Sequence, residues 1–236
     1  MNERLSLVFL PCLMGDRALW ARQQQALHEL LPIGHVDFSK HASIGEMAAA
    51  VLASAPPRFI ACGLSLGGYV AHEIMHIAPE RVAGLALFNT SARPDSPQQT
   101  ENRMILLEKI KTQPLSAITE MALDVLVHPR RRNDQTLCRA IIEMADRIGA
   151  QGFIRQENAI IGRRDSRPNL SRITCPTLIV AGREDAITPV AVHEEMARGI
   201  SGSQLVVIED CGHMSSMERP EQVNLILKNW LEELLG

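Results

Sequence analysis

One stretch of this 236-residue chain decides the fold: FIACGLSLGGYVAHEIMHI, residues 59–77. Its first four residues, Phe59–Cys62, form an apolar run that predicts a buried strand, and residues 66–77 have the apolar spacing of a helix. Between them stands a G-x-S-x-G motif, Gly63-Leu64-Ser65-Leu66-Gly67. A turn this tight exposes its central side chain, and its glycines avoid the clashes that a Cβ would cause. The stretch predicts a strand, a sharp turn and a helix, with Ser65 as candidate nucleophile unless the serine is incidental to a plain glycine turn.

Short apolar runs and segments of helical spacing alternate on both sides of this stretch. Strands are predicted at residues 5–10, 33–38, 59–62, 82–88, 177–181 and 204–208. Helices are predicted at residues 20–31, 44–55 and 66–77, after Thr188-Pro189, and from Pro220 onward. Ser43 and Glu46 have the spacing of a capping box, and Thr188-Pro189 has the pattern of an N-cap followed by proline. Six strands joined by helices predict an α/β fold with a doubly wound, mostly parallel sheet and helices on both faces.

Between the fourth and fifth predicted strands, residues 91–172 contain no convincing strand. Apolar residues recur there only at helical spacing, as at Met104, Leu107 and Ile110. We expect these residues to form a helical cap inserted after the fourth predicted strand. The chain is interpreted as one α/β domain over residues 1–236, with 91–172 as its cap insertion, because no repeat or low-complexity linker divides it.

The charge balance excludes a nucleic-acid binder that works by electrostatic attraction. Lys and Arg number 24 against 27 Asp and Glu, and aromatic residues make up only 3%, so neither a basic surface nor a base-stacking platform is expected. Hydrophobic residues make up 46%, which is enough for a full core. The expected partner is a small molecule, and the sequence does not predict the oligomeric state.

Cysteine use and the short apolar runs indicate a cytoplasmic protein. The 5 cysteines are irregularly spaced and match neither a disulfide framework nor a C-x-x-C metal site. The apolar run at residues 5–10 is short for a secretion signal, and no small-residue cleavage site follows it. No run approaches the ~20 apolar residues that a membrane span needs. No phosphate loop, metal cluster or flavin pattern is found in the sequence, so no cofactor and no metal are expected.

A serine nucleophile needs a base, and one of the 8 histidines has a suitable place for it. His213 lies in Asp210-Cys211-Gly212-His213, directly after the last predicted strand. The carboxyl ends of parallel strands border a common crevice, which is also where Ser65 is expected. The other histidines lie in predicted helices or surface turns, where packing or solvation is the simpler interpretation: His28, His35, His41, His72, His76, His128 and His193.

The base in turn needs a carboxylate to orient it, and three acidic residues qualify. Glu184 and Asp185 directly follow the fifth predicted strand, and Asp210 follows the sixth. Their positions alone leave the choice open. With Asp185 the chain order is serine, aspartate, histidine, which is the order of the α/β-hydrolase arrangement. Asp185 could instead cap the turn at 188–189, and His213 could be a surface loop residue.

From about Leu5 to Leu234 the chain resembles the α/β-hydrolase superfamily. Three segments carry the resemblance: GLSLGG at 63–68, LIVAGRED at 178–185 and CGHMSSMERPE at 211–221. The resemblance implies an α/β-hydrolase fold with Ser65 as nucleophile, Asp185 as acid and His213 as base. It also implies that the first and third strands are neighbours, so that Ser65 faces the loop after Leu10.

The loop after the first strand departs from the family pattern. The family usually has His-Gly there, whereas this chain has Pro11-Cys12. The resemblance assigns the two oxyanion-hole N–H groups to Leu13 and Leu66, and backbone donors tolerate a change of side chain. A serine at position 65 argues against haloalkane dehalogenase and epoxide hydrolase relatives, which have an aspartate there. The chain begins at the family's third strand, so the usual N-terminal hairpin is expected to be absent.

These residues predict a serine hydrolase that cleaves a small carboxylic ester or lactone through an acyl-enzyme intermediate. A carbon–carbon bond hydrolase of ring-cleavage products and a thioesterase are alternatives, because relatives with the same triad do both. A non-catalytic ligand-binding member of the fold is an alternative from another class, although all three triad positions are filled here. The cap supplies aliphatic residues at helical spacing and few aromatic ones, which favours short-to-medium acyl chains.

Two sets of residues near the expected site have two interpretations each. The arginines at 130–132 and 163–164 either contact an anionic substrate, such as one with a second, free carboxylate, or lie in solvent. Cys12, Cys62 and Cys211 lie beside the expected site loops, and they either pack as small apolar residues or offer a reactive thiol.

Overall fold

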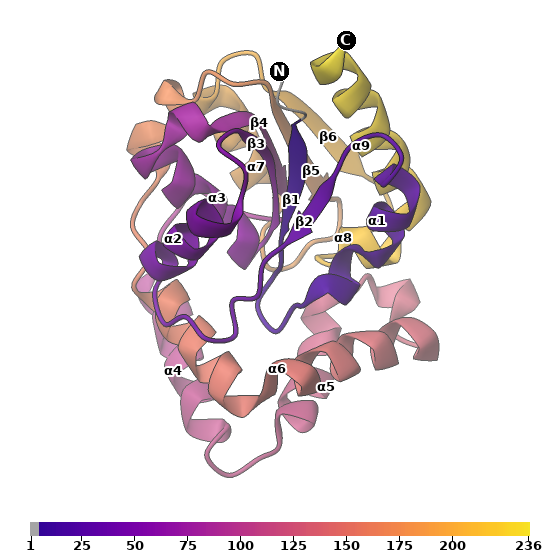
Figure 1. Cartoon of the computed structure of the whole chain (residues 1–236). Coiled ribbons are helices and arrows are strands. Elements are labelled where there is room, and N and C mark those ends of the chain that lie inside the picture. The colour runs from indigo at the N-terminus through magenta and orange to yellow at the C-terminus, as the bar shows by residue number, and fades with distance from the viewer. Residues whose placement is uncertain (1–4) are drawn as a thin grey trace.

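Six parallel strands form the centre of the computed structural model, which describes residues 5–236 (Figure 1). Their order is β2-β1-β3-β4-β5-β6, and each neighbouring pair in this sheet is parallel. The strands span Ser6–Leu10 (β1), Ile33–His35 (β2), Phe59–Leu64 (β3), Val82–Phe88 (β4), Thr177–Gly182 (β5) and Gln204–Ile208 (β6). β1 lies beside β3, as the family resemblance implies, and the strand order reverses at this pair. The predicted fold class, a doubly wound parallel α/β sheet, is confirmed.

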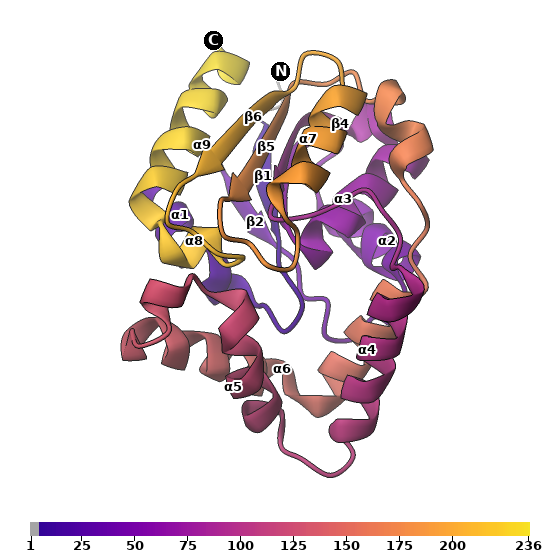
Figure 2. The same cartoon turned by 180° about the vertical axis from the view of Figure 1, so that it is seen from behind.

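Helices cover both faces of the sheet (Figures 1 and 2). One face carries α1 (Ala21–Leu27), α8 (Ser215–Glu218) and α9 (Pro220–Leu235), and the other carries α2 (Ile44–Ser54), α3 (Leu66–Ile77) and α7 (Val190–Gly199). Successive strand residues point to opposite faces of the sheet, and each face has its own hydrophobic core. Phe9 therefore packs in the core on one face and Val8 in the core on the other. Full burial of a side chain of this kind stabilises the fold by about 1.5–3 kcal/mol, and many such side chains on both faces hold the sheet in place.

Three helices lie between β4 and β5: α4 (Pro97–Lys109), α5 (Leu115–Leu126) and α6 (Gln135–Ile161). They lie together at the carboxyl ends of the strands, below the sheet in both views (Figures 1 and 2). This segment, residues 91–172, contains no strand, as expected, and is called the helical insert below. α6 is kinked at Gly149, whose φ of 72° interrupts the helical backbone. Short 3₁₀ helices are found at Arg17–Trp20, Pro79–Arg81, Pro129–Arg131 and Arg167–Arg172.

Some element boundaries differ from those predicted. In the strand expected at 33–38, only Ile33–His35 pairs with β1. The helix expected at 20–31 begins as a 3₁₀ turn, and its α-helical part ends at Leu27. Ser43 caps α2 as predicted, by accepting from Glu46 N–H at 3.1 Å. The Glu46 carboxylate, however, accepts from Ala42 N–H rather than from Ser43 N–H, so the reciprocal half of the capping box is displaced by one residue.

The sequence pattern places Thr188 at the N-cap of α7, and this prediction is wrong. The N-cap is Pro189, which makes no side-chain hydrogen bond to the helix. The Thr188 hydroxyl donates instead to Asp185 Oδ2 at 2.6 Å. Thr188 therefore orients a carboxylate instead of capping the helix, because its hydroxyl lies within hydrogen-bond distance of a charged acceptor.

Two buried histidines should make the folded state sensitive to acid. His72 on α3 and His193 on α7 are buried, and burial lowers the pKa of each from 6.5 to about 4. Between these pH values the unfolded chain binds protons that the folded chain does not, so the free energy of unfolding falls as the pH falls. We expect the melting temperature to fall as the pH is lowered from about 7 toward about 4, the interval between the two pKa values, and to fall less in His193→Gln.

The amide of His193→Gln can keep the hydrogen bond that His193 Nε2 accepts from Thr90 N–H at 3.1 Å, so the variant removes the titration rather than the contact. His28→Gln is the matched control, because His28 is exposed. Melting curves across the pH range measure the effect. The same fall in melting temperature in all three proteins would show that His193 does not couple folding to pH.

Candidate functional site

Ser65 stands at the sharp turn between β3 and α3. Its φ is 55° and its ψ is −111°, a backbone conformation that costs a non-glycine residue about 1–3 kcal/mol. Glycines allow the close approach of chain segments here: a Cβ on Gly63 would collide with the backbone of Gly67, and a Cβ on Gly67 with that of Leu10. Ser65 N–H donates to Phe88 O at 3.0 Å, which anchors the turn on β4. The predicted strand, turn and helix are therefore present, with Ser65 at the start of α3.

His213 and Asp185 form the second part of the site. His213 lies in the loop after β6, residues 209–214, called the histidine loop below. His213 Nδ1 is 2.8 Å from Asp185 Oδ2, and both side chains are buried. Because a carboxylate only accepts, this hydrogen bond assigns the proton to Nδ1 and leaves Nε2 with a free lone pair. Among the described residues, Asp185 is the one acidic side chain in contact with His213; Glu184 accepts a backbone N–H at 3.0 Å, and Asp210 pairs with arginines.

Hydrogen-bond donors surround the Asp185 carboxylate. Oδ1 accepts from Ile187 N–H at 2.8 Å and from Thr188 N–H at 2.9 Å. Oδ2 accepts from the Thr188 hydroxyl and from Asn89 Nδ2 at 2.9 Å. Burial acts to raise the pKa of Asp185, but the electrostatic attraction of His213 and the hydrogen bonds from His213 and Thr188 outweigh burial and hold this pKa well below its ordinary value. Asp185 is therefore an anion at neutral and mildly acidic pH.

In the serine hydrolase that the sequence predicts, Asp185→Asn is expected to lower kcat by roughly 10³–10⁴-fold without unfolding the protein. The amide NH₂ would donate to His213 Nδ1 and so favour the tautomer whose Nε2 carries the proton. Steady-state kinetics on a neutral ester measure the loss. Glu184→Gln is the matched control from the same loop and should stay within about threefold of wild type. A crippled Glu184→Gln beside an active Asp185→Asn would move the orienting role to Glu184.

The Ser65 and His213 side chains line one cavity of about 80 Å³, called the inner cavity below. Most of its other lining residues are apolar and come from the loop after β1, the helical insert, the turn after β5 and the histidine loop: Cys12, Leu13, Met14, Leu126, Ile160, Ile187 and Met214. Tyr69 and Arg103 complete the lining. A cavity of about 150 Å³ in another protein binds one benzene molecule, so a space of this size takes only a small chemical group.

Leu13 lines this cavity, and Leu66 directly follows Ser65. The backbone N–H groups of both residues have no acceptor among residues 5–236. Leu66 is the first residue of α3, where the helix dipole is positive. The loop that carries Leu13 is held by the helical insert, because Met14, with a φ of 59°, donates its N–H to Gln156 Oε1 on α6 at 2.8 Å. Unpaired N–H groups are the donors that a developing oxyanion needs. The Pro11-Cys12 replacement leaves both groups unpaired.

Three polar residues of this region escape prediction from the sequence: Asn89, Gln156 and Arg103. Asn89 is fully buried, and its Nδ2 donates to Asp185 and, at 3.1 Å, to Gly212 O. It therefore ties the acid to the histidine loop. Its place directly after β4, at the same edge of the sheet as the other site residues, is the signal that could have identified it. Gln156 and Arg103 lie in helices of the insert, where apolar periodicity gives no such signal.

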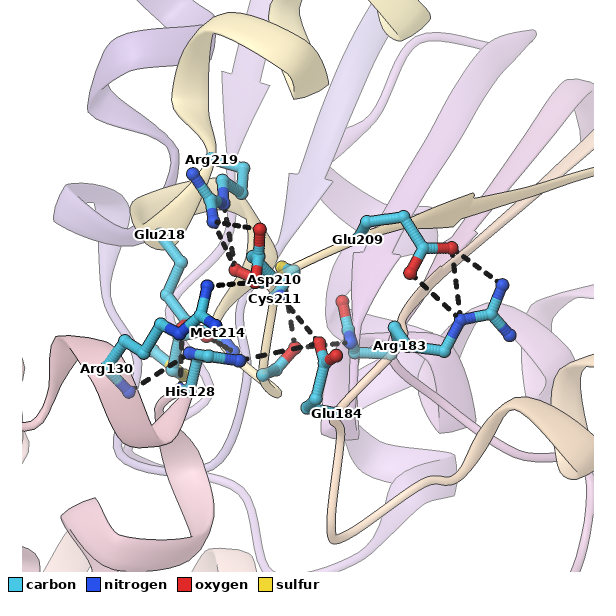
Figure 3. A network of polar contacts seen from close by, with 12 residues as sticks. His128, Arg130, Arg183, Glu184, Glu209, Asp210, Cys211, Met214, Glu218 and Arg219 are labelled. Carbon is cyan, nitrogen blue, oxygen red and sulfur yellow. Dashed lines mark hydrogen bonds and ion pairs between the residues drawn. The ribbon is translucent and has the colours of Figure 1, made fainter.

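A buried carboxylate, Glu218, joins the histidine loop to the helical insert (Figure 3). It accepts from Met214 N–H at 3.1 Å and from His128 N–H at 2.7 Å. Burial raises the pKa of Glu218, although these backbone donors oppose the shift. Next to this contact, His213 N–H donates to Leu126 O at 2.9 Å. The backbone of the candidate base is thus fixed by the end of α5, so the insert and the base are positioned together.

The cysteines beside the site are buried and protonated. Burial raises the pKa of Cys12 to about 12, and it also raises the pKa values of Cys62 and Cys211. A cysteine reacts as its thiolate, which these three thiols do not form near neutral pH. Of the two interpretations, the structure favours packing.

Arg130 and Arg163, from the two expected sets of arginines, have different surroundings. The Arg130 side chain is 79% exposed and pairs with Asp210, and Arg130 does not line the inner cavity. Arg163 is buried and lines a cavity of about 670 Å³ beside the inner one, called the outer cavity below. Arg103, which no sequence motif marks, lines both cavities.

Two kinds of feature are missing from the part of the chain that the structure describes, residues 5–236. No group of His, Cys, Asp and Glu side chains is arranged to hold a metal ion. No helix combines the length and the apolar character that crossing a membrane requires.

Comparisons with known proteins give one family. The chain matches the model of the Alpha/beta hydrolase family over residues 7–224. It is 29% identical over 171 residues to 3-oxoadipate enol-lactonase 2 of Acinetobacter baylyi, a match that covers 71% of this chain and 61% of the lactonase. It is 25% identical over 224 residues to the pimeloyl-[acyl-carrier protein] methyl ester esterase of Nitrosomonas europaea, covering 86% of each chain.

A solved structure is similar over nearly the whole chain. This structure, a thermophilic esterase from Thermogutta terrifontis with malate bound, superimposes with a TM-score of 0.89 and 30% sequence identity, over 98% of this chain and 90% of the esterase. The matched residues 7–224 include the turn at Ser65, the Asp185 loop and the histidine loop. The chain belongs to the alpha/beta hydrolase family.

Proposed function

We propose that this protein is a serine hydrolase of the carboxylesterase or lactonase type, which cleaves a small carboxylic ester or lactone through an acyl-enzyme intermediate. One observation carries the proposal: His213, held by Asp185 at 2.8 Å, and Ser65, held in a strained turn, line the same cavity. The unpaired N–H groups of Leu13 and Leu66 support acyl transfer, because they can stabilise an oxyanion. A lactonase and a methyl ester esterase among the relatives support the type of bond.

In the first half of the proposed reaction, Ser65 Oγ attacks the carbonyl carbon while His213 Nε2 takes the hydroxyl proton. The carbonyl electron pair moves to oxygen, where the N–H groups of Leu13 and Leu66 stabilise the negative charge. One such donor contributes on the order of 10²–10³-fold to kcat. Asp185 keeps the His213 ring oriented and stabilises the imidazolium that forms.

In the second half, the tetrahedral intermediate collapses and the alcohol leaves, taking the proton from His213 Nε2. In a lactone this alcohol remains attached to the far end of the acyl chain. Water then attacks the acyl group on Ser65 while His213 again accepts a proton, and the acid leaves with the Ser65 hydroxyl restored. Water is the one co-reactant of this cycle.

We also propose that the helical insert, residues 91–172, acts as a cap on this single α/β domain. Its helices lie at the carboxyl ends of the strands (Figures 1 and 2). Arg103, Leu126 and Ile160 from the insert line the inner cavity. A cap in this place excludes water from the reacting groups and limits the size of the acyl group.

A substrate panel tests the proposed function. We expect kcat/KM to be highest for acetate or butyrate esters or for a small lactone, and to fall about tenfold or more for an octanoate ester, because the inner cavity has no room for the longer chain. A thioester and a ring-cleavage dienone are included. Turnover of the thioester alone would assign a thioesterase, and turnover of the dienone alone would assign a carbon–carbon bond hydrolase. Binding without any turnover would favour the ligand-binding alternative.

A further inference from the structure

Arg103 on α4 stands where the inner and outer cavities meet. It lines both cavities, and so does Tyr69. Besides Ser65 and His213, these are the only described side chains lining the inner cavity that have a nitrogen or oxygen atom. In an apolar site, a small number of polar groups fixes the orientation of the ligand. Arg103 and Tyr69 are therefore the groups placed to recognise a polar part of the substrate.

Two carboxylates fix the Arg103 guanidinium and leave one of its nitrogens unused. Nε donates to Asp95 Oδ2 and Nη1 donates to Glu157 Oε2, both at 2.7 Å. Nη2 has no hydrogen-bond partner among residues 5–236, and the side chain is 17% exposed. Asp95 is itself held by Arg163 at 2.6 Å, and the Arg163 guanidinium lies 4.2 Å from the centre of the Tyr69 ring. The guanidinium is thus rigid before a ligand arrives, and its remaining donors are available.

The charges around the outer cavity favour an anion. Its described lining contains the arginines Arg93, Arg103, Arg163 and Arg167 and a single carboxylate, Asp95. The carboxylates that pair with Arg93 and Arg167 do not line the cavity. A ligand in this space therefore meets more positive than negative groups.

The immediate surroundings of Arg103 favour an anion with one charge rather than two. Four linked side chains form a charged cluster here: Arg103, Arg163, Asp95 and Glu157. The two positive and two negative charges of this cluster cancel, so a dianion would leave a large uncompensated negative charge. Glu157 Oε1 is buried without a hydrogen-bond partner, and burial raises the pKa of this carboxyl. An approaching negative charge would raise that pKa further and promote proton uptake by Glu157. The cluster can absorb a single added charge in this way.

We propose that Arg103, assisted by the Tyr69 hydroxyl, binds a free carboxylate of the substrate at the junction of the two cavities. The inference rests on the proposed function and specifies its substrate class: an ester or lactone that carries a second, ionised carboxyl group. The inner cavity of about 80 Å³ takes the small acyl part, so the carboxylate belongs to the part of the substrate that extends toward the outer cavity. The guanidinium fork matches the geometry of a carboxylate.

Two matched substrate pairs test this subsite. The first pair is 4-acetoxybutanoate and its neutral primary amide, with the carboxylate on the alcohol part; the second is monomethyl glutarate and its primary amide, with the carboxylate on the acyl part. We expect wild type to prefer 4-acetoxybutanoate to its amide by about tenfold or more in kcat/KM, mainly through KM. In Arg103→Gln this ratio should fall toward one, because the acid loses more kcat/KM than the amide does.

Arg130→Gln is the control, since Arg130 pairs with a surface carboxylate and lines neither cavity, and it should keep the wild-type ratio. If Arg103→Gln does not fold, Arg103→Lys takes its place; it keeps the charge for Asp95 and Glu157 but loses the fork, and its ratio should fall as well. A carboxylate preference in either pair that depends on Arg103 supports the subsite, and the responding pair identifies the side of the ester.

Equal kcat/KM for acid and amide in wild type would overturn the subsite, and so would an acid preference that persists in the folded Arg103 variant. These outcomes are separate from a failure of the proposed function. If the ester bond of the two amide-bearing substrates is hydrolysed, and this hydrolysis depends on Ser65, the serine hydrolase assignment stands without the carboxylate subsite.

Discussion

Ser65→Ala is expected to lower kcat by a factor on the order of 10⁴–10⁶ and to leave the fold intact. The loss is large because the alanine has no oxygen to attack the carbonyl, so the acyl-enzyme route closes completely. Stability should change by less than about 1 kcal/mol, because the Ser65 hydroxyl makes no hydrogen bond within residues 5–236 and alanine keeps the same Cβ in the strained turn. Activity on a short-chain ester, with melting temperature measured on the same samples, tests both parts.

Ser216→Ala is a suitable control for this variant, because Ser216 on α8 is also a buried serine and lines neither the inner nor the outer cavity. It should retain activity within about tenfold of wild type. Hydrolysis by Ser65→Ala within that same margin would remove Ser65 from the role of nucleophile.

His213→Gln is expected to reduce kcat by several orders of magnitude, on a scale similar to Ser65→Ala. Glutamine cannot take the Ser65 proton, although its amide can still donate to Asp185 and so preserve the packing of the histidine loop. Since nucleophile and base act as one unit, the kcat of the double variant should lie within about tenfold of the kcat of either single variant. Multiplicative losses in the double variant would show that His213 and Ser65 act independently and would contradict the proposed proton transfer.

The sequence could predict that Ser65, Asp185 and His213 come together, because each lies in the turn or loop that follows a strand. In a parallel sheet the residues after neighbouring strands meet at one edge, so Ser65 after β3, Asp185 after β5 and His213 after β6 are brought together by topology alone. The choice between Asp185 and its neighbour Glu184 depends on which side chain points inward. Position after a strand did not decide it, whereas the family resemblance and the 2.8 Å contact with His213 do.

Apart from Asn89, the polar residues that escaped prediction lie in the helical insert. Arg103, Gln156 and Glu157 lie on helices of the insert, where a polar residue in the sequence normally indicates a solvent-facing position. Gln156 and Glu157 are nevertheless fully buried, because Gln156 accepts from Met14 N–H and Glu157 pairs with Arg103. These contacts join segments far apart in the chain, and helical periodicity carries no information about them.

The central claim, that Ser65 is the nucleophile of a serine hydrolase, is tested most directly by covalent labelling with a fluorophosphonate. The probe forms a bond to an activated serine Oγ and loses fluoride, so intact-protein mass and peptide mapping identify the modified residue. We expect one label per chain, on Ser65, in wild type, no label in Ser65→Ala, and slow labelling in His213→Gln. Labelling of a different residue, or of Ser65→Ala at the wild-type rate, would contradict the account.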